Sequence, residues 1–90
     1  MKCVINFLQL IEKISDFFDN KNAKAELYNL GNSAITVKVI KTKSINQDHT
    51  IQDFENIDDT TIKNILTNVI DQKNSVKVKI KKRIFLLSLI

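Results

Sequence analysis

Few residues of this chain carry the side chains that catalysis or metal binding requires. His49 is the single histidine and Cys3 the single cysteine among 90 residues. A zinc site needs several such ligands at short, characteristic spacings, and a nucleophile needs a base held beside it. We therefore expect no catalytic residue, no metal and no cofactor. His49 should be solvated in a loop, and Cys3 should pack as a small hydrophobic side chain.

Gly31 is the only glycine. Phosphate loops and dinucleotide fingerprints each need two or three glycines, so enzymes of those nucleotide-dependent classes are excluded. The segment 48–59 carries five carboxylates and no lysine or arginine. It lacks the central glycine and alternating ligands of a calcium loop, so we expect its carboxylates to cap a helix, to be solvated, or to lie across basic residues elsewhere.

The segment 73–83 is the basic counterpart of this acidic tract, with six lysines and arginines. Within it, apolar and basic residues alternate, as in a strand with one solvent-exposed face. If the apolar side faces a core, the open sheet surface displays a basic set that could bind phosphodiester backbones: Lys38, Lys77, Lys79, Lys81 and Arg83. No aromatic residue interleaves with them for base stacking, and arginine occurs once. The alternative is that these lysines have no binding role and only keep this face of the sheet soluble.

The elements that position these residues follow from hydrophobic periodicity. Apolar residues recur at helical spacing over 4–18 and again over 62–70, where Asp58 or Asp59 supplies the N-cap. The segment 33–43 alternates as a strand. Residues 23–30 fit a helix capped by Gly31 or a strand entering a Gly31-Asn32 hairpin equally well, and both readings stay open. A two-residue loop would set Glu26 opposite Val37 and Leu27 opposite Thr36, which mixes the faces, whereas a three-residue loop would place Ala25 and Leu27 on the apolar side.

The remaining connection and the C-terminus set the architecture. The segment 44–56 shows no sustained period and is predicted to be a long loop with a short strand around Ile51. The helix before the last segment suggests a right-handed β-α-β crossover, which would place 33–43 and 76–90 parallel in one sheet. Residues 75–90 are predicted to be one long strand that bends near 81–83, because sixteen residues in one straight strand would be longer than a domain of this size.

The apolar run at the end of this strand must be shielded from water on both faces of the sheet. If even positions are buried under the helices, then Phe85, Leu87 and Leu89 point to the opposite face and need a cover. The cover could be the 44–56 loop, a second copy of the chain, or another protein. We expect a protein interface formed by Phe85, Leu87, Leu89, Lys82 and Arg83.

Composition fits a single soluble domain over residues 1–90, with 43% hydrophobic and 27% charged residues. One cysteine favours a reducing, cytoplasmic setting, and the apolar C-terminal run is too short to span a membrane. The predicted fold is α+β, a small two-layer sandwich with two to four strands and two main helices on one face, in the order α-(β or α)-β-α-β.

The predicted function is a non-catalytic interaction or accessory protein, such as a homodimer or an inhibitor of a larger target. We expect it to have no membrane partner and no small-molecule substrate. The alternative is a basic nucleic-acid-binding module that uses the lysine-rich sheet face.

Overall fold

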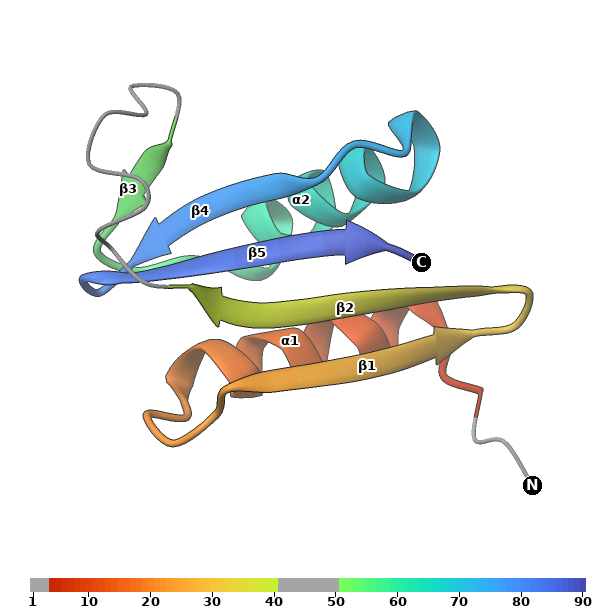
Figure 1. Ribbon diagram of the computed structural model, residues 1–90, viewed down its shortest axis with the longest axis horizontal. Coiled ribbons are helices and arrows are strands. Elements are labelled where there is room, and N and C mark those ends of the chain that lie inside the picture. The colour runs from red at the N-terminus through yellow and green to blue at the C-terminus, as the bar shows by residue number, and fades with distance from the viewer. Residues whose placement is uncertain (1–3, 41–50) are drawn as a thin grey trace.

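The computed structural model describes residues 4–40 and 51–90, which form two layers (Figure 1). The described elements are α1 (Phe7–Asp19), β1 (Ala25–Leu30), β2 (Ser33–Ile40), β3 (Gln52–Phe54), α2 (Asp59–Gln72), β4 (Val76–Ile80) and β5 (Arg83–Leu89). The strands form one mixed sheet in the order β1-β2-β5-β4-β3, and α1 and α2 lie on the same face of it (Figure 1). The α+β class and the one-sided helical layer are as predicted, but the sheet has five strands instead of two to four.

Both helices begin where a polar side chain satisfies their free N–H groups. Asn6 caps α1 in a reciprocal capping box with Gln9, so the helix starts at Phe7 although the apolar pattern begins at Val4. Asp58 caps α2: its Oδ1 accepts hydrogen bonds from Thr61 N at 2.8 Å and Thr61 Oγ1 at 2.7 Å. Each helix turns its apolar stripe toward the sheet.

The ambiguous segment 23–30 forms a strand. Gly31 at φ 78° and Asn32 make a two-residue turn, and Glu26 pairs with Val37, which is the register expected for such a loop. Gly31 adopts the positive φ of this turn at little cost, because it has no Cβ. The register places Tyr28 and Leu30 on the helical side.

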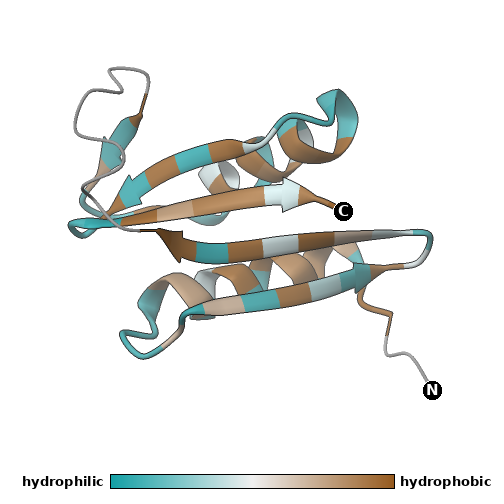
Figure 2. Cartoon of the chain, viewed as in Figure 1, coloured by the Kyte–Doolittle hydropathy of each residue, from teal (hydrophilic) through white to brown (hydrophobic). Residues whose placement is uncertain are grey.

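The C-terminal segment is a hairpin of two strands, so the prediction of one bent strand is wrong. Lys81 (φ 49°) and Lys82 (φ 69°) form a two-residue turn, and Ile80 pairs with Arg83 across it. Two turn residues shift the alternation, so that Val78 and Phe85 face the same side. Phe85, Leu87 and Leu89 of β5 therefore face the helices. The apolar side of β4, whose alternation is visible in Figure 2, faces them too.

The predicted parallel pairing of 33–43 with the C-terminal strand is also wrong. β2 pairs antiparallel with β5, while the parallel pair is β3 with β4, joined through α2. A β-α-β unit is present, but it is not the predicted one: its first strand is the three-residue β3, near the short strand expected around Ile51, and not 33–43. Because β5 lies between β2 and β4, and β4 lies between β5 and β3, both strands of the C-terminal hairpin are paired on both edges.

Phe85 lies at the centre of the core with none of its surface exposed. Its ring centroid is 4.7 Å from that of Phe18 and 5.9 Å from that of Phe17, in tilted and edge-on arrangements. These contacts join α1 to the middle strand of the sheet. The stripe of α2, which includes Leu66 and Val69, completes the same cluster from the other side.

The β4–β5 turn places two lysines in the left-handed region, where each non-glycine residue costs about 1–2 kcal/mol. Replacing Lys81→Asn together with Lys82→Gly should raise the free energy of unfolding by about 1 kcal/mol, because Asn-Gly adopts such turns readily. Urea denaturation measures the change. The Lys81→Ala, Lys82→Ala double variant removes the same charges without relieving the backbone. An equal rise in that control would contradict the explanation.

Candidate interaction surfaces

The sheet face turned away from the helices, called the open face below, has no described helix across it (Figure 1). Strand register assigns its side chains, which run across the sheet in three main rows. These rows are Leu27–Thr36–Ser88, then Ala25–Lys38–Leu86–Lys77, and then Ile40–Ile84–Lys79–Asp53. The face therefore combines an aliphatic centre with basic side chains on either side of it.

Leu86 and Ile84 form the aliphatic centre of the open face. Leu86 lies between Lys38 and Lys77 in the pairing of β2, β5 and β4, and it is half-buried. Ile84 is only 5% exposed, although it lies on the side opposite the main core. Long lysine side chains cover apolar surface with their aliphatic stems while the ammonium groups stay in water. Lys38, Lys77 and Lys79 lie beside this centre in the strand pairing.

Three of the five residues of the predicted basic set lie together. Lys38, Lys77 and Lys79 share the open face, as the alternation indicates. Lys79 Nζ lies 3.9 Å from Asp53 Oδ2, on the neighbouring strand β3. One carboxylate of the acidic tract therefore reaches the basic face through strand pairing. No described aromatic side chain joins the lysines, because the aromatic residues of the strands, Tyr28, Phe54 and Phe85, lie on the helical side.

Arg83 does not join this set, so its predicted place on the open face is wrong. The two-residue turn puts it on the helical side, beneath the end of α1. Its Nη1 donates to Asn20 O at 3.0 Å, its Nη2 donates to Phe18 O, and its guanidinium lies 5.0 Å from the centroid of the Phe85 ring. Arg83 thus satisfies carbonyl groups at the C-terminus of α1, where the helix dipole favours a cation.

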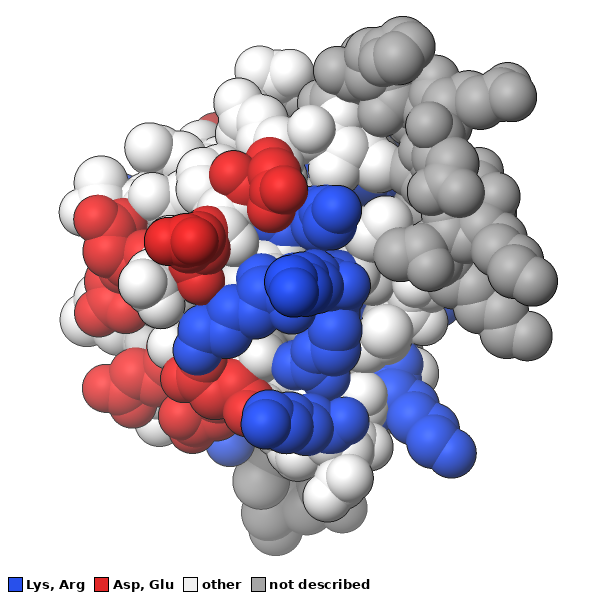
Figure 3. Space-filling model, turned by 90° about the vertical axis from the view of Figure 1, so that its left-hand side faces the viewer, with Lys and Arg blue, Asp and Glu red and all other residues white. Residues whose placement is uncertain are grey.

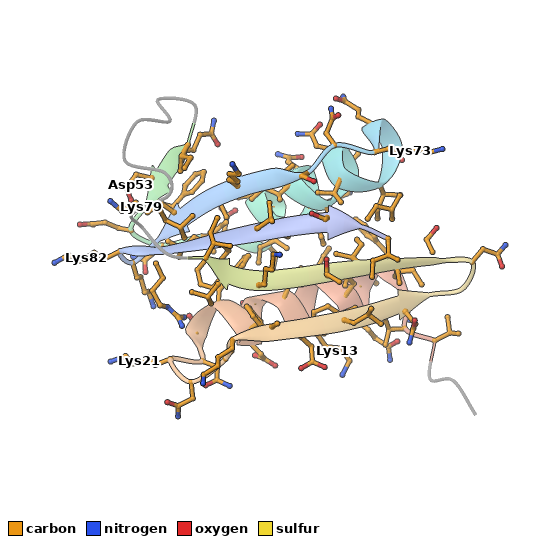
Figure 4. The ribbon with its side chains drawn as sticks, in the orientation of Figure 1. Lys13, Lys21, Asp53, Lys73, Lys79 and Lys82 are labelled. Carbon is orange, nitrogen blue, oxygen red and sulfur yellow. The ribbon has the colours of Figure 1, made fainter. Side chains whose placement is uncertain are left out.

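The β4–β5 turn carries the other basic residues at one end of the molecule. Lys81 Nζ lies 3.5 Å from Asp19 Oδ1, and the side chain of Lys82 projects from the turn (Figure 4). Seen from this end, lysines and arginine gather at the centre, with acidic side chains beside them (Figure 3). Exposed pairs of this kind contribute little to stability, but they reduce the charge available to a polyanion.

Phe85, Leu87 and Leu89 do not form the predicted apolar interface. Phe85 and Leu87 are completely buried under the helices, and Leu89 is half-buried against the same core. The error came from carrying one alternation through Lys81-Lys82, which has neither the Asn nor the Gly that signals a two-residue turn. Of the predicted interface, only Lys82 is exposed, and Arg83 and Leu89 are half-buried. The predicted apolar interface is therefore part of the core and is not a surface.

A groove of about 370 Å³ between α1 and β1 was not predicted. It is lined by Lys13, Asp16, Phe17, Asn20, Ala23, Ala25, Glu26 and Tyr28. Tyr28 Oη donates to Lys13 O at 3.4 Å. Burial, Glu26 and Asp16 raise the pKa of the Tyr28 hydroxyl to about 12, because each disfavours a phenolate anion in the groove. These residues come together only because β1 packs beside α1 in the folded chain.

Other predicted chemistry lies partly beyond the described residues. Cys3, Asp48 and His49 fall outside them, as does the segment 41–50 that would include most of the predicted loop. In residues 4–40 and 51–90, no group of three or more histidine, cysteine, aspartate or glutamate side chains is placed to hold a metal ion. Over the same ranges, no helix has the length and apolar character needed to cross a membrane.

The chain was also compared with known proteins. No protein-family model, no curated protein and no solved structure matches it.

Arg83 is expected to stabilise the fold through its contacts with α1. Arg83→Lys keeps the charge but loses the forked geometry that reaches two carbonyl groups, and should lower the free energy of unfolding by about 1–2 kcal/mol. Chemical denaturation measures this. Lys63→Ala, on an exposed position of α2, serves as the control and should change the value by about 0.5 kcal/mol or less. Equal effects of the two variants would contradict the assigned contacts.

Tyr28 is the only tyrosine, so its ionisation can be followed directly by ultraviolet absorbance. The native hydroxyl should titrate near pH 12, against an ordinary pKa of 10.0. Because the folded pKa is raised, the stabilisation is complete below the unfolded pKa and is lost as pH rises from about 10 toward 12. Glu26→Gln should lower the native midpoint. A native midpoint near 10, unchanged by this substitution, would refute the assigned electrostatics of the groove.

Proposed function

We propose that the chain is a non-catalytic interaction protein that binds a protein partner through the open face of its sheet. The observation that carries this proposal is the row in which Leu86 lies between Lys38 and Lys77, next to the buried Ile84. An aliphatic centre bordered by polar side chains is the usual anatomy of a protein–protein interface. The five-stranded sheet supplies a firm platform for such a surface, since its other face is the hydrophobic core.

The energetics favour a partner with both apolar and acidic surface. Removing apolar area from water at the centre would supply binding free energy at about 25 cal/mol per Å² before the costs of association. The lysines around the centre would steer a complementary acidic partner and discriminate against basic ones. Binding should therefore weaken moderately as salt rises, because only the electrostatic part of the interaction is screened. We propose that it acts in this way as an accessory or inhibitor protein of a larger target.

Nucleic-acid binding is the second candidate, and the specific observation in its favour is the shared position of Lys38, Lys77 and Lys79. Two features weigh against it. Arg83 is engaged with α1, and Lys79 and Lys81 have carboxylate neighbours, which leaves fewer cations to neutralise phosphates. The open face also offers no described aromatic side chain on which a base could stack. We therefore rank protein binding above it.

Leu86→Glu tests the proposal, because it places an acid at the centre of the open face without disturbing the core. A photoreactive residue at position 38 would first capture the partner from a lysate of the source cells, and purified partner would then be titrated. We expect Leu86→Glu to weaken binding by at least about tenfold through lost apolar contact and repulsion of acidic surface. Lys63→Glu adds the same acid on α2 and should leave affinity nearly unchanged.

Three results would contradict protein binding at this face. One is capture of no protein at position 38 above the level obtained from position 63, and another is equal affinity of the two glutamate variants. The third is tight binding of single-stranded DNA or RNA that is lost at high salt and weakened by Lys38→Glu. That result would favour the nucleic-acid candidate.

A further inference from the structure

The outer edge of β1 presents backbone groups that can pair with another strand. Val39 N donates to Lys24 O at 2.9 Å, which fixes the direction of alternate residues in this hairpin. Glu26, Tyr28 and Leu30 consequently point their N–H and C=O groups toward β2, while Ala25, Leu27 and Asn29 point theirs outward. On this edge the described residues supply one backbone partner, Ile5 N, which donates to Asn29 O at 3.0 Å.

This edge has few of the features that usually prevent strands from pairing. It contains no proline and no lysine within Ala25–Leu30, and its middle residue, Leu27, is 46% exposed on the open face. At the opposite edge of the sheet, β3 is only three residues long. Short edge strands resist pairing, so the two edges differ in the way expected if one of them is used.

We propose that β1 pairs antiparallel with β1 of a second copy about a two-fold axis through Leu27, which joins two sheets into one. This inference is independent of the proposed partner on the open face. In the pairing, Leu27 N–H donates to the Leu27 carbonyl of the second copy. Asn29 N–H donates to the Ala25 carbonyl of that copy, and its Ala25 N–H donates back to the Asn29 carbonyl. The symmetry makes each bond twice. The Asn29 carbonyl can keep its bond to Ile5, since an oxygen accepts two hydrogen bonds.

Side chains favour this register over its neighbours. It places the exposed Leu27 against its symmetry mate on the open face, and it places Glu26 opposite Tyr28 on the helical side. A shift of the axis by one residue toward Ala25 would put Glu26 opposite Glu26, and directly opposed like charges destabilise a strand pair. A closed two-fold contact of this kind also removes the free edge from solution.

Charges on α1 add complementarity to the pairing. Lys13 and Asp16 line the groove beside β1 together with Glu26 and Tyr28, the residues on either side of Leu27. Figure 4 shows the side chain of Lys13 beside the outer edge of β1. The axis brings the two grooves together with their α1 helices antiparallel. Lys13 of each copy then faces Asp16 of the other, and Asp16 faces Lys13. The two sites therefore repeat one complementary ion pair on either side of the axis.

Complementary charge variants test this arrangement. In the Asp16→Lys variant, each facing pair consists of two lysines. In the Lys13→Asp variant, each facing pair consists of two aspartates. The association constant of each variant alone should be at least about tenfold lower than that of the unmodified chain, because both ion pairs become like-charged. An equimolar mixture should recover association, since every lysine then faces an aspartate. Sedimentation equilibrium from low micromolar to near-millimolar concentration measures these constants, and far-ultraviolet circular dichroism confirms folding.

Leu27→Lys provides a separate arm that leaves α1 unchanged. It should abolish the dimer by opposing two ammonium groups on the axis, whereas Leu8→Lys, at a position 75% exposed on α1, should not. The proposal is overturned if the unmodified chain stays monomeric throughout the concentration range. It is also overturned if Leu27→Lys associates as the unmodified chain does, or if mixing the charge variants gives no gain. None of these results would bear on partner binding at Leu86.

Discussion

The fold depends on the two-residue turn at Lys81-Lys82, because this turn decides which side chains of β5 enter the core. Phe85 and Leu87 are completely buried only because Ile80 pairs with Arg83. A turn longer or shorter by one residue would exchange the two faces of β5, moving Leu86 inward and Phe85 into solvent. Phe85 contacts Phe17 and Phe18, so the same turn also determines how α1 attaches to the sheet.

The turn also explains the unequal fates of neighbouring basic residues. Arg83, on the helical side, donates to carbonyl groups at the end of α1, whereas Lys79 stays on the open face beside Asp53. The positive φ angles of Lys81 and Lys82 are a local cost that the hairpin offsets by burying apolar side chains of both strands. Basic residues of one segment thus divide between contacts with α1 and the open face of the sheet.

Most local elements could be predicted from the sequence, since each depends on a pattern within a few residues. The apolar stripes of α1 and α2, the cap at Asp58 and the alternation of β2 all appear where expected. The C-terminal hairpin could not be predicted, because lysines occupy turn positions that normally show Asn or Gly. With the turn missed, the face of Phe85 and the place of Arg83 were both assigned wrongly.

The candidate surfaces likewise include one part that a local sequence pattern predicts and other parts that depend on distant contacts. Lys38, Lys77 and Lys79 were grouped correctly, because alternation within β2 and β4 is local. The groove between α1 and β1 depends on contacts between Lys13 and Tyr28, fifteen residues apart, and no short pattern announces it. The outward groups of β1 likewise become visible only once its pairing with β2 and the position of Ile5 are known.

The pairing of β4 with β5 is the central claim, and cross-strand nuclear Overhauser effects test it most directly. Lys79 pairs with Ile84, and Lys77 pairs with Leu86. Both are pairs without mutual backbone hydrogen bonds, whose Cα atoms approach most closely in an antiparallel ladder. The account predicts strong Hα–Hα effects within each pair. Only sequential contacts through residues 76–89, as in one continuous strand, would contradict it.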